Sequence, residues 1–294
     1  MADHLLGVDI GGTSLKCVRV DAATGETLQR WRVPTQPLRQ AGFATAFADY
    51  LGGLEPIAGV GLGVPGMLSP DQRGCVQVDT LPSLNGFALA DTLQRRLGSA
   101  FAKTPRVRLA NDASCAALGL RALAPELPAS FLLVGLGTGV GGALVQDGRL
   151  FVGPQGNALE PGYQLLPGGG FLEGEFGVAG LLRRFRENGV EVPAARLRER
   201  LDTADEVAVR VRGELRAALA WTLNALVLAL DVRAIVLGGG NAPSTPDFYA
   251  ELTRELRATL PAYYAEVAVR PVPDVPHAAY AAALGAAELV RRSR

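Results

Sequence analysis

The chain has few histidines, cysteines and lysines. Its 294 residues include two histidines, three cysteines and, among 29 basic residues, only two lysines. Cys17, Cys75 and Cys115 lie far apart and form no CxxC pair, which argues against a zinc knuckle and against a disulfide framework. The formal net charge is zero, so no long-range field attracts nucleic acid or an anionic membrane. We therefore expect a reduced, cytoplasmic setting and neither of these partners.

A P-loop and a long apolar run are also missing. The sequence contains no GK[ST] triplet, which excludes a P-loop. Its most apolar segment, Ala217 to Leu230, is shorter than the ~20 residues of a membrane span and contains Asn224, so we interpret it as a buried helix. Segments 61–66 and 137–142 match GxGxxG, but a dinucleotide site needs a helix directly after the loop, and neither segment is followed by one.

The sequence does contain two glycine–threonine turns, each between two apolar runs that are predicted strands. The first is Gly11–Thr13 and the second is Gly137–Gly139. Glycine lets backbone N–H groups approach a ligand closely, and a row of such groups binds an anion. Hairpin turns alone would explain one such pattern. Because the arrangement occurs twice, we interpret it as a duplicated unit that binds phosphate.

The order of predicted elements indicates an α/β protein with two lobes and mixed sheets. Three antiparallel strands over residues 4–35 precede alternating helices and strands, and the same order begins again at Phe131. Helices are expected at 41–54, 86–97, 113–123, 173–187, 203–230, 247–260 and 277–292. Gly98 is expected just after the second of these helices. We expect residues 1–110 to form a smaller lobe and 111–276 a larger, nucleotide-side lobe, with the terminal helix, 277–294, packing back on the first.

Five motifs, in order along nearly the whole chain, resemble those of the ROK family of bacterial sugar kinases, within the actin/hexokinase-like superfamily. They are Asp9-Ile-Gly-Gly-Thr-Ser-Leu-Lys16, Val64-Pro65-Gly66, Asn111-Asp112, Gly137-Thr-Gly-Val-Gly-Gly-Ala143 and Ile235-Val-Leu-Gly-Gly-Gly240. The resemblance implies two RNase-H-like lobes of the actin/hexokinase type around a central cleft. Sugar would bind in the cleft and nucleotide mainly on the second lobe.

The resemblance also implies roles for individual residues. Asp112 is the expected general base, Asp9 the carboxylate on the side of Mg²⁺, acting through water, and Asn111 and Gly66 belong to the sugar site. Asp112 could also cap the helix that follows it, and Lys16 is either a phosphate contact or a solvated side chain. The expected phosphate and nucleotide contacts are Gly11, Gly12, Thr13, Thr138, Gly139, Gly238, Gly239 and Gly240.

The chain departs from the family at the motif that holds zinc. Glu160-Pro161-Gly162-Tyr163 stands at an ExGH element and Gly170-Phe171-Leu172-Glu173 at a GCxE element, and the cysteine cluster is missing. We therefore expect no structural zinc. Carboxylates accept hydrogen bonds from sugar hydroxyls, so Glu160 and Glu173 are expected at the sugar, although solvated loop residues are the alternative. Tyr163 either donates to a sugar hydroxyl or only packs.

These observations favour an ATP- and Mg²⁺-dependent hexose kinase, glucokinase-like, that phosphorylates a primary hydroxyl. A polyphosphate donor is one alternative. A catalytically idle sugar-binding protein is another, because tyrosine replaces a sugar-site histidine. A sugar-sensing repressor is disfavoured, because the first phosphate motif begins at Asp9 and the chain has no basic patch for DNA. The family further implies a homodimer.

Overall fold

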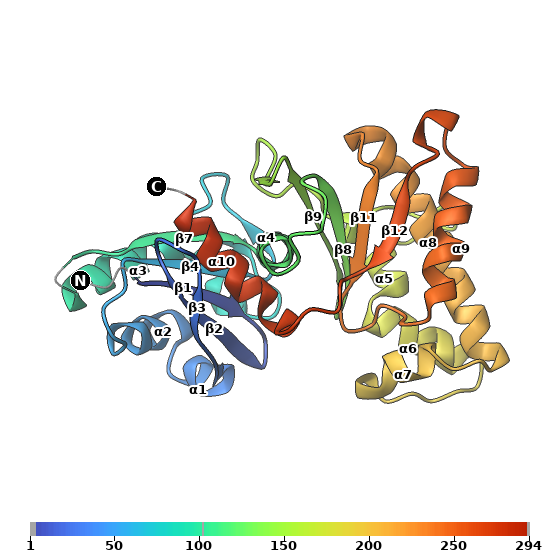
Figure 1. The fold of residues 1–294 in the computed structure, drawn as a ribbon. Helices are drawn as coiled ribbons and strands as arrows, with labels where there is room; N and C mark the ends of the chain where they lie inside the picture. Colours follow the sequence, from blue (N-terminus) through green and yellow to red (C-terminus); the bar gives the residue numbers. More distant parts are fainter. Residues whose placement is uncertain (1–3, 102, 293–294) are drawn as a thin grey trace. The chain divides into compact units, whose positions relative to one another are not determined.

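The chain forms two compact units in the computed structural model, which describes residues 4–101 and 103–292 (Figure 1). Unit 1 comprises Met1–Leu127, Gly148–Ala158 and Asp274–Arg294, and unit 2 comprises Pro128–Asp147 and Leu159–Pro273. The sequence placed the boundary after residue 110, whereas residues 111–127 belong to unit 1.

Residues 111–127 belong to unit 1 because helix α4 (Asp112–Leu123) packs closely on the terminal helix α10 (Ala281–Arg291). A Cβ on Gly119 of α4 would lie 1.7 Å from the carbonyl oxygen of Ala281, and one on Gly285 would lie 1.7 Å from that of Cys115. Glycine at both positions therefore lets the two backbones touch. Helix α10 also packs on β1 and β4, so the terminal helix lies on the first unit.

Unit 1 is built on a five-stranded sheet of order β3-β2-β1-β4-β7. Its strands are β1 (His4–Ile10), β2 (Ser14–Asp21), β3 (Thr27–Pro34), β4 (Gly59–Val64) and β7 (Arg106–Asn111). As predicted, β2 is antiparallel to both β1 and β3, whereas β4 and β7 run parallel to β1. The carboxyl ends of β1, β4 and β7 therefore meet at one edge of this sheet.

Successive residues of β1 are buried on opposite faces of this sheet. Leu5 packs with α10, whereas Leu6 faces the core that α2 and α3 contribute to. The remaining helices of this unit are α1 (Thr35–Gln40), α2 (Phe43–Gly52) and α3 (Leu89–Ala100). The prediction that Gly98 follows a helix is wrong. Gly98 lies inside α3, where its missing Cβ makes room for Thr104 Oγ1, which would otherwise lie 2.9 Å away.

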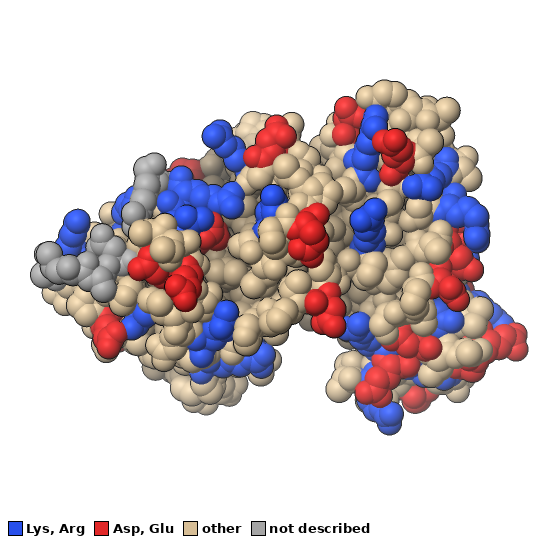
Figure 2. Space-filling view, viewed as in Figure 1, with Lys and Arg blue, Asp and Glu red and all other residues tan. Residues whose placement is uncertain are grey.

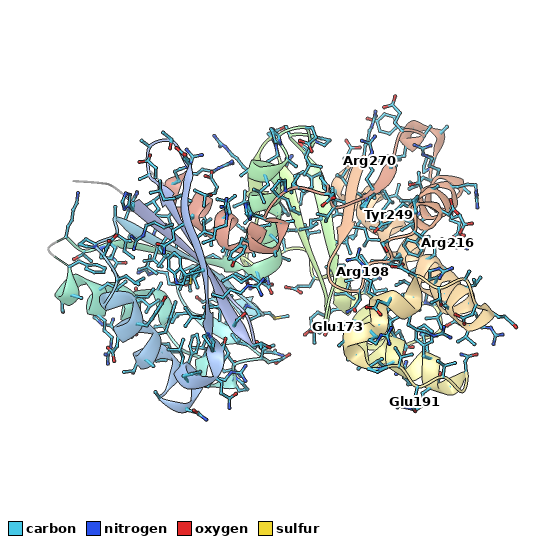
Figure 3. All side chains as sticks on the ribbon, turned by 60° about the horizontal axis from the view of Figure 1, so that its bottom comes forward. Glu173, Glu191, Arg198, Arg216, Tyr249 and Arg270 are labelled. Carbon is cyan, nitrogen blue, oxygen red and sulfur yellow. The ribbon has the colours of Figure 1, made fainter. Side chains whose placement is uncertain are left out.

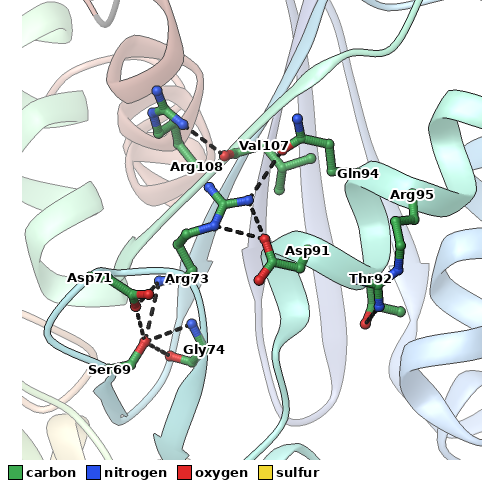
Figure 4. A network of polar contacts seen from close by, with 10 residues as sticks. All are labelled: Ser69, Asp71, Arg73, Gly74, Asp91, Thr92, Gln94, Arg95, Val107 and Arg108. Carbon is green, nitrogen blue, oxygen red and sulfur yellow. Dashed lines mark hydrogen bonds and ion pairs between the residues drawn. The ribbon is translucent and has the colours of Figure 1, made fainter.

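The segment between β4 and α3 contains a small sheet of β5 (Met67–Leu68) and β6 (Cys75–Gln77). Arg73 ties this segment to α3, because its Nε donates to Asp91 Oδ1 at 2.8 Å and its Nη2 to Gln94 Oε1 at 3.2 Å (Figure 4). The Ser69 hydroxyl oxygen accepts from the Gly74 N–H at 2.8 Å. A segment with little regular structure is thereby fixed by side-chain hydrogen bonds.

The second sheet repeats the topology of the first, with the order β10-β9-β8-β11-β12. Its strands are β8 (Phe131–Leu136), β9 (Val140–Gln146), β10 (Arg149–Phe151), β11 (Ala234–Gly238) and β12 (Ala268–Pro271). β8 is antiparallel to β9, whereas β8, β11 and β12 are parallel. The predicted duplication is present, although β10 lies in the segment 148–158 that is assigned to unit 1.

Helices cover the core of unit 2. They are α5 (Leu172–Phe176), α6 (Val178–Glu187), α7 (Leu197–Leu201), α8 (Glu206–Leu230) and α9 (Pro246–Ala258). The short helix α7 has no counterpart in the sequence prediction.

Single 3₁₀ turns occur in both units. They are η1 (Pro82–Leu84), η2 (Pro161–Tyr163), η3 (Ala194–Arg196), η4 (Ala262–Tyr264) and η5 (Ala278–Tyr280).

Helix α8 is the one helix, within the part of the chain that the structure describes, whose length and composition would allow it to cross a membrane. A core helix passes the same test, and Leu215, Leu219 and Leu223 of α8 are fully buried in unit 2. The same helix carries Arg216, whose Nε donates to Glu255 of α9 at 2.6 Å (Figure 3). On the face seen in Figure 2, basic and acidic side chains are interspersed.

Candidate active site

The first glycine–threonine turn joins β1 to β2 and leaves Gly12 and Thr13 exposed. Thr35, buried at the start of α1, holds the turn: its N–H donates to the Thr13 carbonyl at 3.0 Å and its hydroxyl to the Gly11 carbonyl at 2.7 Å. A Cβ on Gly11 would lie 2.6 Å from the carbonyl oxygen of Ser14. Thr35 therefore fixes the backbone of the turn, while Gly12 and Thr13 remain exposed.

Asp9 lies near the end of β1, directly opposite Lys16 of β2. The Lys16 ammonium donates to Asp9 Oδ2 at 2.9 Å, and the Asp9 residue is only 8% exposed. Lys16 thus pairs with a carboxylate of its own unit and is not a wholly solvated side chain, while a phosphate contact by Lys16 stays a prediction. A nearly buried carboxylate needs such a partner.

Asn111 and Asp112 lie where β7 runs into α4. Asn111 is the N-cap, because its Oδ1 accepts from the N–H groups of Ala113 at 2.8 Å and Ser114 at 3.4 Å. Its Nδ2 donates to the Gly66 carbonyl at 3.1 Å. Asp112 is the first residue of α4 and also accepts from the Ala113 N–H, at 2.8 Å. The capping role considered for Asp112 therefore belongs to Asn111.

Gly66 serves this arrangement through its backbone. Its φ of +110° favours glycine, and a Cβ would lie 2.1 Å from the carbonyl oxygen of Gln77. Its carbonyl oxygen receives the amide of Asn111. Gly66 and Asn111 together fix the position of the backbone from which Asp112 extends.

The environment of Asp112 changes its acidity. Burial raises the pKa of this carboxyl to about 6, and the negative charge of Asp9 adds to the increase, against the opposing effects of the Ala113 N–H and of Lys16. A carboxylate with a pKa near 6 is mostly ionised at neutral pH and accepts a proton more readily than an ordinary carboxylate. This corner of unit 1 can therefore act as a general base.

The second glycine–threonine turn, in unit 2, is packed more tightly. A Cβ on Gly139 would lie 2.1 Å from Glu173 Oε2, and the same oxygen accepts from the Val140 N–H at 2.9 Å. The Val178 N–H, at the start of α6, donates to the Thr138 carbonyl at 3.1 Å. Thr138 itself is exposed. Glu173, labelled in Figure 3, thus joins the start of α5 to the second turn.

The loop that carries Glu160 is pressed against β9. A Cβ on Gly142 would lie 2.8 Å from the Pro161 ring, and one on Gly162 would lie 2.5 Å from the Val140 carbonyl oxygen. Leu159, directly before Glu160, has a φ of +71°, a strained conformation for leucine that costs about 1–3 kcal/mol. Such strain persists where the surrounding structure holds it, and it is common at functional sites.

The residues at the family's zinc positions do not fit a zinc ion. Tyr163 and Phe171 make an edge-to-face contact with ring centroids 6.1 Å apart, and Leu165 pairs with Phe171 in an isolated bridge. Neither ring offers a thiolate or an imidazole. Over residues 4–101 and 103–292, no three His, Cys, Asp or Glu side chains gather into a metal-binding group. The Tyr163 ring packs against Phe171, and a hydrogen bond from its hydroxyl to a sugar stays a prediction.

The third glycine turn, after β11, is bonded to the second. The backbone N–H of Asn241 donates to the Leu136 carbonyl at 3.0 Å, and its Nδ2 donates to the Gly137 carbonyl at 3.1 Å. Gly239 has a φ of +99°, and a Cβ there would lie 2.2 Å from the Leu136 carbonyl oxygen. Asn241 was not among the predicted site residues, although its position after three glycines is a recognisable turn signal.

Each unit therefore gathers its own set of predicted residues. Unit 1 brings Asp9, Gly66, Asn111 and Asp112 to the carboxyl edge of its sheet, where ligands bind in open α/β sheets. Unit 2 packs the turn at Gly139 directly against Glu173. Glu160 lies on the loop pressed against the same strand, β9.

Comparison with known proteins identifies the family. The family model described as "ROK family" matches residues 5–293. The chain belongs to the ROK family. The glucokinase of Halalkalibacterium halodurans is 30% identical over 270 residues, which cover 80% of this chain and 79% of that protein. The N-acetyl-D-glucosamine kinase of Vibrio cholerae is 36% identical over 177 residues, which cover 55% of this chain and 52% of that protein.

A solved structure supports the fold. The ROK hexokinase from Thermus thermophilus is 27% identical and superposes with a TM-score of 0.76, over 99% of this chain and 100% of that one. The predicted α/β fold of the actin/hexokinase type is confirmed by this likeness. The prediction of a sugar kinase is confirmed at the level of the enzyme class, because the relatives are named as sugar kinases.

Proposed function

We propose that this chain transfers the γ-phosphoryl group of ATP to a hydroxyl of a hexose, with Asp112 as the general base. The observation that carries the proposal is the position of Asp112. It stands at the carboxyl edge of the unit 1 sheet, with a pKa raised to about 6. General-base assistance of this kind contributes typically ~10²–10⁴-fold to a rate.

The first turn is proposed to receive the transferred phosphoryl group. The exposed residues Gly12 and Thr13 offer backbone N–H groups, and Thr35 fixes their geometry. Phosphoryl transfer requires mainly positioning and charge neutralisation, which a fixed turn supplies. The turns at Thr138–Gly139 and Gly238–Gly240 are proposed to hold the nucleotide and its phosphates on unit 2.

Mg²⁺ is proposed to accompany ATP, with Asp9 as the protein carboxylate on its side. Asp9 fits this role, because Mg²⁺ takes hard oxygen donors, keeps several waters and usually needs only one or two protein carboxylates. When bound, the ion supplies positive charge to the phosphate oxygens. Lys16 keeps Asp9 in place through the 2.9 Å ion pair.

Glu160 and Glu173 are proposed to bind the sugar. Glu160 lies on the loop packed on β9 and Glu173 at the start of α5, where one of its oxygens is already used by the Val140 N–H. The other oxygen remains suited to a sugar hydroxyl. Two relatives, named as a glucokinase and an N-acetyl-D-glucosamine kinase, support a hexose or an N-acetylhexosamine as substrate. A cytoplasmic location and a homodimer are proposed from the family alone.

The test is a coupled assay of ADP formation with glucose, mannose, fructose, N-acetylglucosamine and N-acetylmannosamine. We expect turnover of at least one sugar with ATP and Mg²⁺, and little turnover by the Asp112→Asn variant. Competition between ATP and polyphosphate identifies the donor. Binding of a sugar by calorimetry without turnover of any would instead identify an idle sugar-binding protein.

A further inference from the structure

An arginine lies beside the first glycine turn and has no part in the function proposed above. Arg39, on α1, is exposed, and its Nη2 lies 3.7 Å from the place that a Cβ on Gly12 would take. The same nitrogen donates a hydrogen bond to the backbone carbonyl of Thr80. The guanidinium therefore lies next to the exposed part of the turn.

Helix α1 is held in a way that fixes where Arg39 begins. Thr35, four residues earlier, is fully buried and bonds to the turn through both its N–H and its hydroxyl. Leu38, the residue before Arg39, is buried in the core of unit 1. The position of Arg39 over the turn thus follows from packing on both sides of the helix.

The charges around the turn favour an added cation. Asp9 and Asp112 place two carboxyl groups at this edge of the sheet, and the nearby ammonium of Lys16 is bonded to Asp9. Among the ion pairs of the described residues, none joins Arg39 to a carboxylate. An incoming phosphoryl group would meet these carboxylates, and a guanidinium offers five N–H donors in a fixed fork that suits phosphate oxygens.

We propose that Arg39 and the Gly11–Thr13 turn form a binding subsite for a phosphoryl group. Within the proposed function, on which this inference rests, the group is the one that passes from donor to sugar. Arg39 binds its oxygens through the guanidinium N–H groups, while the turn offers backbone N–H groups. The ligand class is a phosphate monoester or the terminal phosphate of a donor.

A purely structural role is the competing explanation, because Arg39 also bonds the carbonyl of Thr80. Arg39→Gln separates the two roles. The glutamine amide keeps an N–H donor for this carbonyl but carries no charge, whereas Arg39→Lys keeps the charge and loses the fork. Arg95→Ala is the matched control, since Arg95 is an exposed arginine of unit 1 whose Nη2 donates to Thr92 at 3.2 Å (Figure 4).

The experiment measures the binding of inorganic phosphate to the whole protein by ³¹P NMR titration at constant ionic strength. We expect Arg39→Gln to bind phosphate roughly 10-fold or more weakly than the unchanged protein, because hydrogen bonds between charged groups are stronger than those of a neutral amide. Arg39→Lys is expected in between, and Arg95→Ala is expected to match the unchanged protein. Phosphate affinity that is absent, or equal in Arg39→Gln and the unchanged protein, overturns the proposal.

Kinetic measurements separate this inference from the proposed function. If a sugar is phosphorylated, Arg39→Gln should lower kcat and weaken inhibition by the sugar phosphate product, while the KM for the sugar stays unchanged. Turnover that is independent of Arg39 would contradict the proposed subsite but support the proposed kinase function. Phosphate binding that depends on Arg39, without turnover of any sugar, would support the subsite but contradict the proposed kinase function.

Discussion

The two glycine–threonine turns occupy equivalent places in two sheets of the same topology, yet their surroundings differ. In unit 1 the turn at Gly12 is open, and ionisable groups such as Asp9 and Asp112 lie at the same edge of the sheet. In unit 2 the turn at Gly139 is packed against Glu173. A glycine motif therefore specifies a strand–turn–strand geometry, while the residues packed around it decide the chemistry. Under the proposed function, general-base chemistry would belong to unit 1 and substrate positioning to unit 2.

Loss of the Asp112 carboxylate in unit 1 is expected to have the largest effect, a fall in kcat. Asp112→Asn keeps an oxygen that accepts from the Ala113 N–H but cannot accept a proton, so kcat should fall by roughly 10²–10⁴-fold. KM values for ATP and sugar should change little, as measured in the coupled assay. Glu173→Gln, the matched change in unit 2, should act mainly on the KM for the sugar. If Glu173→Gln lowered kcat as strongly as Asp112→Asn does, the contrast between the units would be lost.

Packing of α4 on α10 gives the next prediction. Gly119→Ala should lower the free energy of unfolding by about 1–3 kcal/mol or more, because its Cβ would lie 1.7 Å from the carbonyl oxygen of Ala281. Urea unfolding followed by circular dichroism measures the change. Gly174→Ala, in α5 of unit 2, has no atom within 4 Å of the new Cβ and serves as the control. Equal stability of the two variants would show that α4 and α10 are packed less closely than the structure indicates.

The raised pKa of Asp112 predicts a pH dependence of stability. Its pKa is about 6 in the folded protein and near 3.8 when unfolded, so the folded state binds more protons between these values. Stability from this group is therefore present below pH 4 and is lost as the pH rises through 6. Asp112→Asn should stabilise the protein at pH 8 by roughly 1–3 kcal/mol, and the gain should vanish below pH 4.

Thermal unfolding at pH 4, 6 and 8 measures this dependence for Asp112. The pH dependence of activity should run opposite to that of stability, because the general base must be ionised. The kcat/KM should rise with pH through about 6 and then level off. A gain from Asp112→Asn that is equal at pH 4 and pH 8 would contradict the raised pKa.

Much of the fold could be predicted because strands and turns follow local patterns. The apolar runs on either side of the first glycine turn, and their repeat at Phe131, predicted both hairpins, and Asp112 was found next to a predicted strand end. The unit boundary was wrong because it depends on α10, which packs on α4 from more than 150 residues away along the chain. No local pattern around residue 110 carries that contact.

The site could be predicted only in part, for the same reason. Motifs identified Asp112 and Glu173, but the hydrogen bond of Glu173 to Val140 and the cap by Asn111 depend on three-dimensional geometry. Arg39 was missed because nothing in its immediate sequence marks it, and only the packing of α1 brings it beside Gly12. The role of Lys16 could not be decided from the sequence, because its partner Asp9 lies on the neighbouring strand β1.

The smallest expected effect contrasts two glycines inside helices. Gly213, in the interior of α8 in unit 2, has no atom within 4 Å of an added Cβ, unlike Gly119 in α4. Helix propensity favours alanine at both positions, so Gly213→Ala should raise the free energy of unfolding by about 0.5–1 kcal/mol, whereas Gly119→Ala should lower it. The same urea unfolding experiment measures both variants. A loss of stability in Gly213→Ala would mean that this face of α8 is covered in the native protein, since propensity alone can only add stability there.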